Sequence, residues 1–244
     1  MKTALITGAS GGIGMALVKK FASEGYFVLC HYNSEKGGEE LKREIEKNGL
    51  GETTFLYRAD FSHQEKVEEL AKKVLSDFGH VDLLINNAGI DLYQTVTDTK
   101  LSDFNNLMNI NFTSAFILTK AVLPEMIKRK EGNIINVSSV WGSVGASMES
   151  VYSASKSALI GFSKAVAKEV APSNVRVNCI CPGVIDTPMN DCFTSEEKLE
   201  IISDIPLARI GKAEEVADFI CFIASKKASY ITGQVLTLDG GYAL

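Results

Sequence analysis

The chain has little of the residues that build metal sites and disulfides. Its 244 residues include five cysteines and three histidines, with no C-x-x-C pair and no histidines at ligand spacing. Neither a disulfide framework nor a zinc site is indicated, so a reducing compartment is the expected setting. We expect no metal at the functional site.

Long hydrophobic runs and an excess of positive charge are also missing. The apolar stretch after Met1 and Lys2 covers only four residues, too short for a signal-peptide core or a membrane span. The formal net charge is -5, and no long basic run offers a face for nucleic-acid phosphates. We therefore expect a cytoplasmic protein with neither a membrane nor a nucleic acid as its partner.

What the sequence does contain is a regular alternation of short apolar runs with longer amphipathic segments. The runs "LITG", "FVLC", "LLIN" and "IINVS" are apolar throughout, as strands buried on both faces of a parallel sheet are. With the closing run "GQVLTLDGG", the pattern predicts a Rossmann-like, doubly wound α/β fold. Its parallel sheet has seven strands, with helices on both faces. No linker or repeat interrupts residues 1–244, so we expect a single dinucleotide-binding catalytic domain.

One segment, residues 188–212, breaks this alternation. Its two prolines and its short helix-like middle lie between a strand near 175–181 and a helix over 213–224. Ligands of open α/β sheets bind in the crevice at the carboxyl ends of the strands. We therefore predict a substrate lid over that crevice, with an ordinary surface excursion as the alternative.

A glycine-rich stretch, "TGASGGIG", follows the first predicted strand and opens a helix. Gly8, Gly12 and Gly14 permit a tight turn and the close approach of a pyrophosphate to free N–H groups at the helix N-terminus. This placement predicts dinucleotide binding. Asp60 and Asn87 end the third and fourth strands at the same edge, where we expect contacts with adenosine. Turn and capping chemistry is the alternative for both residues.

The end of the second strand, "CHYNSEK", bears on the choice between NADP and NAD. It offers no acid at the last strand residues, where a carboxylate would hold a ribose 2'-hydroxyl and repel a 2'-phosphate. NADP is therefore the predicted cofactor. His31, Asn33, Ser34 and Lys36 are candidates for the extra phosphate, but Glu35 lies among them and NAD remains possible.

A tyrosine and a lysine stand four residues apart in "YSASK", on a helix predicted from about Tyr152 to Val170. At 100° per residue, Tyr152 lies about 40° and Lys156 about 80° from the centre of the apolar stripe. A cation there would lower the pKa of the phenol toward neutrality, as a general acid in carbonyl reduction requires. Ser139, at the end of the strand "IINVSS", is placed to hold the substrate oxygen. The alternative is a boundary aromatic residue beside a surface lysine.

Asn111 is out of place in a long helical region predicted from about Leu101 to Lys130. Asparagine is a poor helix former, and a buried amide among apolar neighbours needs hydrogen-bond partners. Packing alone does not explain the residue, which makes it a candidate member of the site.

Together, "TGASGGIG", "NNAG", "NINFTSAF", "INVSS", "YSASK" and "CPGVIDT" resemble the short-chain dehydrogenase/reductase family over essentially the whole chain. The C-terminal part, from "PLARIGK" to "LDGG", is similar to the bacterial 3-oxoacyl-[acyl carrier protein] reductase branch. The resemblance implies NADPH-dependent reduction of a 3-oxoacyl thioester, linked to acyl carrier protein, to the 3-hydroxyacyl thioester. It also implies a homotetramer.

The same resemblance implies a role for each of four catalytic residues. Tyr152 would protonate the carbonyl oxygen, and Ser139 would orient it. Lys156 would hold the ribose hydroxyls and lower the tyrosine pKa, and Asn111 would anchor a water in the proton relay. The predicted cofactor contacts are Gly8, Ser10, Gly12, Ile13, Gly14, Asn33, Asp60, Asn87, Ala88, Gly89, Tyr152, Lys156, Pro182, Gly183, Ile185 and Thr187.

Two departures from the family pattern keep other functions open. Gly11 stands where many NADP-using relatives have arginine, and Pro172 and Ser173 follow "EVA", where carrier-protein reductases tend to have arginine. The basic run at 128–130 is either a contact for an acidic carrier protein or a solvated helix end. The alternatives are an NAD(P)-dependent dehydrogenase of another small alcohol, sugar or ketone, and a non-catalytic dinucleotide-binding protein.

Overall fold

Seven short strands form one parallel sheet. The computed structural model describes residues 1–190 and 194–243. The strands are β1 (Thr3–Ile6), β2 (Phe27–Tyr32), β3 (Thr54–Arg58), β4 (Leu83–Asn86), β5 (Gly132–Val137), β6 (Val175–Pro182) and β9 (Val235–Leu238). Their order is β3-β2-β1-β4-β5-β6-β9, and every neighbouring pair is parallel. From β1 the chain adds β2 and β3 on one side, and it then returns to the centre and adds β4 on the other side of β1. The switch point of the strand order therefore lies between β1 and β4. The prediction of a seven-stranded, doubly wound sheet is confirmed.

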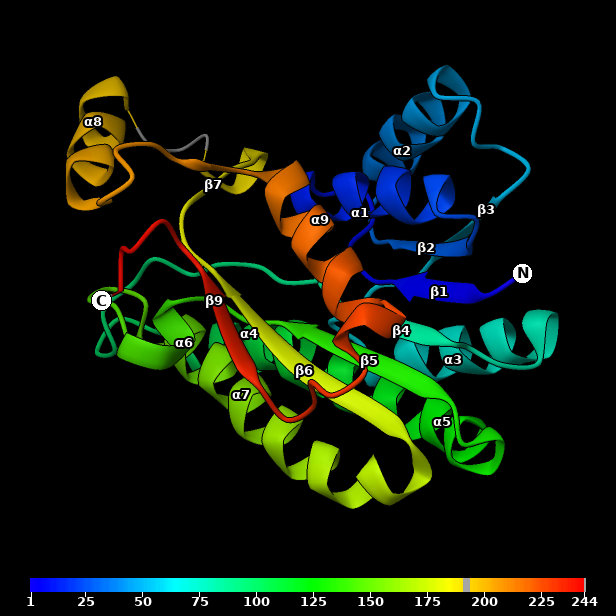
Figure 1. The fold of residues 1–244 in the computed structure, drawn as a ribbon. Helices are drawn as coiled ribbons and strands as arrows, with labels where there is room; N and C mark the ends of the chain where they lie inside the picture. The colour runs from blue at the N-terminus through cyan, green and yellow to red at the C-terminus, as the bar shows by residue number, and fades with distance from the viewer. Residues whose placement is uncertain (191–193, 244) are drawn as a thin grey trace.

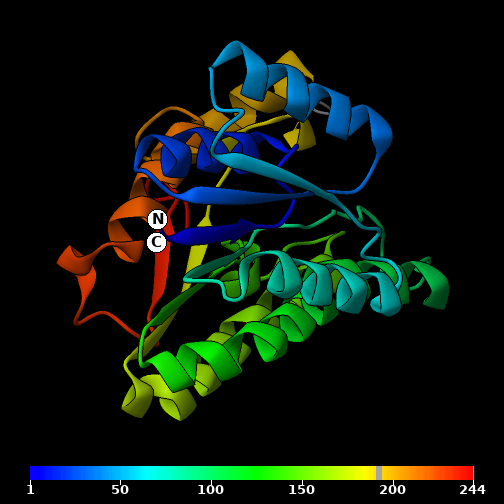
Figure 2. The same cartoon turned by 90° about the vertical axis from the view of Figure 1, so that its right-hand side faces the viewer.

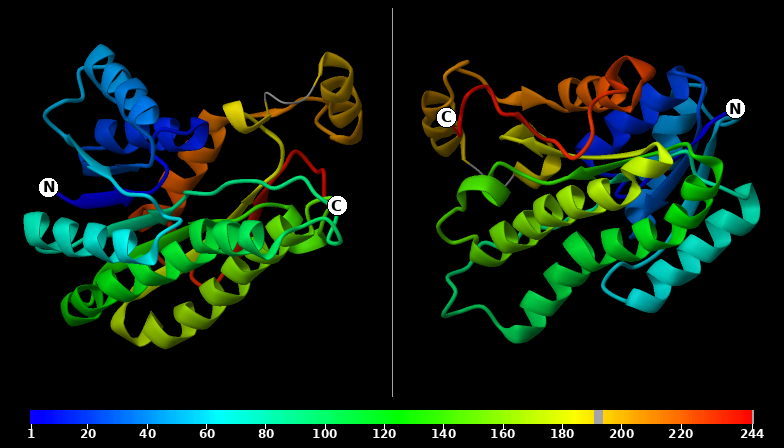
Figure 3. Two further views of the ribbon diagram at one scale, coloured as in Figure 1. Left: turned by 180° about the vertical axis from the view of Figure 1, so that it is seen from behind. Right: turned by 60° about the horizontal axis from the view of Figure 1, so that its bottom comes forward.

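Helices cover both faces of this sheet (Figures 2 and 3). On one face lie α1 (Gly12–Ser23), α2 (Glu35–Lys47) and α9 (Ala213–Ala224), and on the other α3 (Gln64–Phe78), α5 (Ser114–Arg129) and α7 (Ser150–Val170). Each layer has its own apolar core: Phe21 is fully buried in the first and Leu118 in the second. Strands enclosed in this way must be apolar on both faces, which explains the uniform runs in the sequence.

The long helical region consists of three pieces. α4 (Leu101–Met108) continues into a π-helical turn, η1 (Asn109–Thr113), and then into α5. The sequence predicted uninterrupted helix and missed this turn, which holds the buried Asn111. By length and composition the run Leu101–Arg129 would pass as a membrane span. In the structure its apolar side packs in the core through residues such as Leu118 and Met126.

The remaining elements gather mostly around the carboxyl ends of the strands, at the left in Figure 1. They are α6 (Trp141–Val144), η2 (Ala171–Ser173), β7 (Ile185–Asp186), η3 (Pro188–Asn190), α8 (Ser195–Asp204), β8 (Gly211–Lys212) and η4 (Lys226–Ala228). Within the predicted lid, a capping box between Thr194 and Glu197 starts α8. Residues 191–193 of that segment lie outside the described residues.

Candidate active site

A cavity of about 780 Å³ lies along the carboxyl edge of the sheet. It brings together most of the residues that the sequence singled out, although they come from segments up to 179 positions apart. Asp60 and Asn111 are not among the residues that line it. The predicted residues in its wall are Gly8, Ser10, Gly12, Ile13, Gly14, Asn33, Asn87, Ala88, Gly89, Ser139, Tyr152, Lys156, Pro182, Gly183, Ile185 and Thr187.

The glycine loop fits the pyrophosphate of a dinucleotide. Gly8 has a φ of +65°, and a Cβ there would lie 2.9 Å from the Cα of Ala88. A Cβ on Gly14 would lie 2.0 Å from the carbonyl oxygen of Gly8, so no side chain fits inside the turn. Gly11 caps α1 without a side-chain hydrogen bond, which leaves the first N–H groups of the helix available to a ligand. This cradle would hold a pyrophosphate.

Asn87 and Ala88 attach the end of β4 to the glycine loop. Both backbone N–H groups donate to the Thr7 hydroxyl at 2.9 Å, and Asn87 Nδ2 donates to the carbonyl oxygen of Thr7 at 2.9 Å. These contacts fix the shape of the loop at the switch point of the sheet. The adenosine contact expected of Asn87 remains a prediction.

His31 does not supply a positive charge for a phosphate. It is buried, its Nδ1 accepts a hydrogen bond of 3.1 Å from the N–H of Gly8, and its Nε2 lies 2.9 Å from the carbonyl oxygen of Ala59. Burial lowers the pKa of His31 to about 4, so the ring is neutral at pH 7. The ring stacks on Phe61 with a centroid distance of 3.7 Å. Its role in this structure is to support the floor of the cavity.

The other candidates for the phosphate end have partners in the protein. The hydroxyl of Ser34 caps α2 by accepting from the N–H of Gly37, and Lys36 is 86% exposed, with Nζ 3.9 Å from Glu40 Oε1. Asn33 lines the cavity. Arg58, which the sequence did not single out, donates from Nε to the carbonyl oxygen of Asn33 at 3.2 Å.

Asp60 forms the turn hydrogen bonds that were the alternative to a contact with adenosine. Its Oδ1 accepts hydrogen bonds from the N–H and the hydroxyl of Ser62, at 2.9 and 2.7 Å. These bonds hold the pKa of Asp60 below its usual value. The structure thus gives Asp60 a part in the turn before α3, and its contact with adenosine stays a prediction.

Tyr152 and Lys156 lie one turn apart on α7, and both side chains are buried, with 9% and 4% of their surface exposed. The sequence placed Lys156 only at the flank of the buried face. The structure buries it more deeply because α6, which the sequence missed, packs over that flank: a Cβ on Gly142 would lie 2.9 Å from the Cβ of Lys156. Burial lowers the pKa of Lys156 to about 8.

The structure does not show the lowered pKa that was expected of Tyr152 beside Lys156, and that role of the lysine stays a prediction. Burial raises the pKa of Tyr152 well above its usual value, and the charges of Asp91 and Glu149 raise it further. A hydrogen bond with Ser139 opposes them. The ammonium lies 5.6 Å from the centre of the Tyr152 ring and donates instead to the carbonyl oxygen of Val137. The phenol therefore keeps its proton at neutral pH.

Asn111 acts as a clamp behind the cavity. Its Oδ1 accepts from the N–H of Ile90, and its Nδ2 donates to the carbonyl oxygen of Ile90, both at 2.9 Å. Nδ2 also donates to the Ser155 hydroxyl at 3.0 Å. The side-chain amide is thus engaged with the protein, and its contact with a relay water remains a prediction. The clamp fixes the loop that follows β4.

Two carboxyl groups in the cavity wall, those of Asp91 and Glu149, were missed by the sequence reasoning. Glu149 lies three residues before Tyr152 at the N-terminus of α7, and this spacing was the available signal. Asp91 follows the clamped Ile90. Burial and the charge of Asp91 raise the pKa of Glu149 to about 7.

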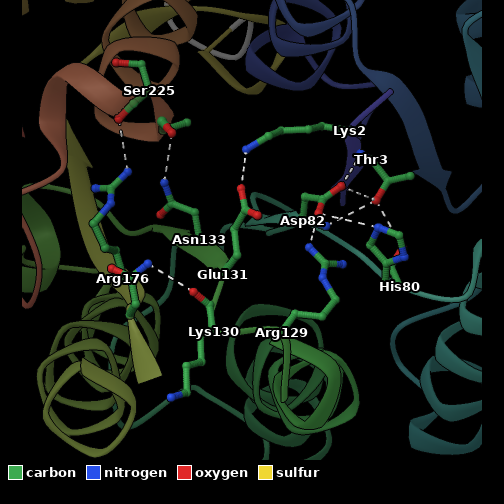
Figure 4. Close-up of polar contacts among 12 residues, drawn as sticks. Lys2, Thr3, His80, Asp82, Arg129, Lys130, Glu131, Asn133, Arg176 and Ser225 are labelled. Carbon is green, nitrogen blue, oxygen red and sulfur yellow. Dashed lines mark hydrogen bonds and ion pairs between the residues drawn. The ribbon is translucent and has the colours of Figure 1, made fainter. Parts of the chain in front are cut away.

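The basic run at 128–130 lies where α5 leads into β5 (Figure 1), and Figure 4 shows Arg129 and Lys130 among the polar contacts there. Lys128 and Arg129 end α5, Lys130 caps it, and Glu131 separates the run from Gly132, the first residue of β5. Arg129 forms an ion pair with Asp82, which precedes β4, and Lys128 pairs with Glu125 at 3.2 Å. These contacts fit the alternative of a solvated helix end, and an attraction of the run for an acidic carrier protein stays a prediction.

The fold and the cavity define an oxidoreductase that binds a nicotinamide dinucleotide. The family model of the short chain dehydrogenases matches residues 2–198, and the chain belongs to this family. It is therefore an NAD(P)-dependent enzyme that acts on CH–OH groups.

Proteins of known sequence are similar to this chain over nearly its full length. The chain is 40% identical over 241 residues to an uncharacterized oxidoreductase, YmfI, of Bacillus subtilis, covering 99% of this chain and 98% of that protein. It is 40% identical over 243 residues to the 3-oxoacyl-[acyl-carrier-protein] reductase FabG of Thermotoga maritima, covering 100% and 98%. For FabG of Escherichia coli the identity is 37% over 240 residues, covering 98% and 96%.

A solved structure has the same fold. It is a blue fluorescent protein from a metagenomic library in complex with NADPH. The TM-score is 0.93 at 30% sequence identity, over 100% of this chain and 98% of the other.

Proposed function

We propose that the chain reduces the keto group of a 3-oxoacyl thioester linked to acyl carrier protein, with NADPH as the reductant. One observation carries this proposal. Ser139, Tyr152 and Lys156 share a cavity with the glycine loop, in a chain that matches reductases named FabG along its whole length. The fold positions a proton donor and a dinucleotide cradle on the same edge of one sheet.

The chain's own residues account for the orientation of the keto group and for the proton transfer. When bound, the nicotinamide supplies the hydride. The hydroxyl of Ser139 orients the keto oxygen, and the hydroxyl of Tyr152 donates its proton to that oxygen as the negative charge develops. The hydroxyl of Tyr152 is protonated at neutral pH, so it can act as the donor in reduction. Lys156, which lines the same cavity, would hold the ribose hydroxyls of the cofactor.

The preference for NADPH is part of the proposal. Asn33 lies in the cavity wall at the end of β2 and carries no charge to repel a 2'-phosphate. Arg58 holds the backbone of Asn33 and pairs with Glu35 at 2.7 Å. NAD stays possible because Gly11 leaves the loop without an arginine.

A homotetramer in the cytoplasm is also proposed. Apolar side chains are exposed on the long helices and near the last strand, where assembly would cover them: Phe104 (38% exposed), Phe116 (43%) and Phe222 (45%). Sedimentation of the purified protein gives the test. A mass of four chains is expected, and a monomer would contradict the proposal.

The substrate is tested by turnover. The initial rate of NADPH or NADH oxidation is measured with an acetoacetyl thioester, a sugar and a simple ketone. The proposal expects the highest kcat/KM for the thioester with NADPH. Absence of thioester reduction, together with brisk turnover of a sugar or simple ketone, overturns it.

A second candidate is the oxidoreduction of another small alcohol, sugar or ketone. Gly11 in the glycine loop and Ser173 shortly after "EVA" favour it, because NADP-using relatives and carrier-protein reductases tend to have arginine at these places. Saturable activity on a carrier-bound substrate at low micromolar concentration would count against this second candidate.

A further inference from the structure

The substrate end of the cavity carries more negative than positive charge. Asp91 and Glu149 line it beside Ser139 and Tyr152. Of the basic side chains in the described part of the wall, His31 is neutral at pH 7 and Lys156 is the one that carries charge. That ammonium is buried and donates to the carbonyl oxygen of Val137.

The position of Glu149 is fixed by the backbone around it. Its carbonyl oxygen accepts from the N–H of Ser153 at 2.8 Å, as the N-cap residue of α7. The N–H of Gln94 donates to the carbonyl oxygen of Met148 at 2.6 Å, and Gln94 forms a parallel bridge with Glu149. Met148 adopts a left-handed φ of +66°, a conformation that a methionine rarely takes. The tight turn presents the Glu149 side chain to the cavity.

The position of Asp91 is fixed by the loop that follows β4. It follows Ile90, whose backbone N–H and carbonyl oxygen both bind Asn111. The N–H of Leu92 donates to Asp91 Oδ1 at 2.6 Å. The charge of Asp91 acts on both Glu149 and Tyr152, as their shifted pKa values show. Two segments far apart in the sequence thus place two carboxyl groups next to the proposed proton donor.

We propose that Asp91 and Glu149 are specificity-determining residues that admit neutral 3-oxoacyl esters and thioesters and exclude the free 3-oxo acids. The inference rests on the proposed function. A thioester and its hydrolysis product carry the same keto group, but the free acid is an anion that would bring a third carboxylate beside Asp91 and Glu149. Repulsion between like charges in a partly buried site costs far more than in water. The pair therefore excludes the hydrolysed substrate by its charge.

The test compares two compounds that differ in charge, ethyl acetoacetate and acetoacetate. Their kcat/KM values are measured with NADPH at pH 8, where Glu149, with a pKa of about 7, is ionised. The wild type is expected to favour the ester by at least about a hundredfold. In the double variant Asp91→Asn/Glu149→Gln the preference is expected to fall by at least about tenfold, mainly through a lower KM for acetoacetate.

Two controls make the result specific. Glu52→Gln removes one negative charge from the exposed loop before β3, outside the cavity wall and outside the predicted lid, and is expected to leave the preference unchanged. The Kd of NADPH, measured by fluorescence, shows that the double variant is folded. If the wild type reduces the ester but the double variant keeps the full preference, the inference is wrong and the proposed function stands. If the wild type reduces no 3-oxo compound at all, the proposed function fails and the inference with it.

Discussion

Lys156 donates a hydrogen bond of 3.0 Å from Nζ to the carbonyl oxygen of Val137, the last residue of β5. The lysine thereby ties the catalytic helix α7 to the central strand of the site. The contact keeps the ammonium in a buried position, where its pKa falls to about 8. A lysine in this place costs stability, because the folded protein must bury its charge.

Replacing Lys156 should therefore make the protein more stable at neutral pH. Lys156→Met keeps the length of the side chain and removes the charge, and we expect the free energy of unfolding at pH 7 to rise by about 3 kcal/mol. Between pH 8 and 10.5 the unfolded wild type binds more protons than the folded one, so the stability of the wild type increases with pH. The advantage of the variant should shrink over that range in urea titrations. A variant less stable than the wild type at pH 7 would contradict this explanation.

The choice of cofactor should respond to Asn33. Asn33→Asp puts a carboxylate at the end of β2, where it repels a 2'-phosphate and accepts a hydrogen bond from a 2'-hydroxyl. We expect kcat/KM with NADPH to fall by at least about tenfold and to change much less with NADH. Steady-state rates with both cofactors measure the effect. Equal losses for both would mean that Asn33 does not face the 2' position.

The Asn111 clamp should matter for stability as well as for turnover. Asn111→Ala leaves the N–H and carbonyl oxygen of Ile90 without their partner, and we expect unfolding to become easier by about 2 kcal/mol. The loop that carries Asp91 should loosen at the same time. Hydrogen exchange of residues 88–94 gives the local measurement, with faster exchange expected. Unchanged exchange there would show that the loop does not depend on the clamp.

Alcohol oxidation should show the raised pKa of Tyr152 directly. The phenolate must accept the proton in that direction, so the rate should keep rising with pH well into the alkaline range. Asp91→Asn removes a charge that raises this pKa, and the profile should move to lower pH. The matched control Glu52→Gln, outside the cavity wall, should leave the profile in place. A profile of Asp91→Asn identical to that of the wild type would show that Asp91 does not act on Tyr152.

The sequence predicted the sheet well because buried parallel strands leave a plain signal in uniform apolar runs. It also predicted where the cofactor cradle lies, since Gly8 and Gly14 have a steric reason to be glycine. The π-helical turn at Asn111 was missed because a single wide turn inside a long helix leaves no pattern of its own in the sequence, although the misfit of Asn111 was a signal. The depth of Lys156 was underestimated because the cover comes from α6, a four-residue helix with no periodic pattern.

The pair of Asp91 and Glu149 shows a further limit of prediction from the sequence. Their positions differ by 58 in the sequence, and they meet only through the bridge between Gln94 and Glu149 and the clamp on Ile90. Each residue alone looks like an ordinary surface acid. The structure brings them together, and the pKa of Glu149 is raised by burial and, in addition, by Asp91.

The central claim is that the hydroxyl of Tyr152 supplies the proton for reduction. Tyr152→Phe deletes that hydroxyl and keeps the ring, and single-turnover oxidation of enzyme-bound NADPH by an acetoacetyl thioester measures the consequence. The account predicts a rate lower by at least about a thousandfold, with the Kd of NADPH within about twofold of the wild-type value. A rate within a few-fold of the wild type, with NADPH bound normally, would contradict it.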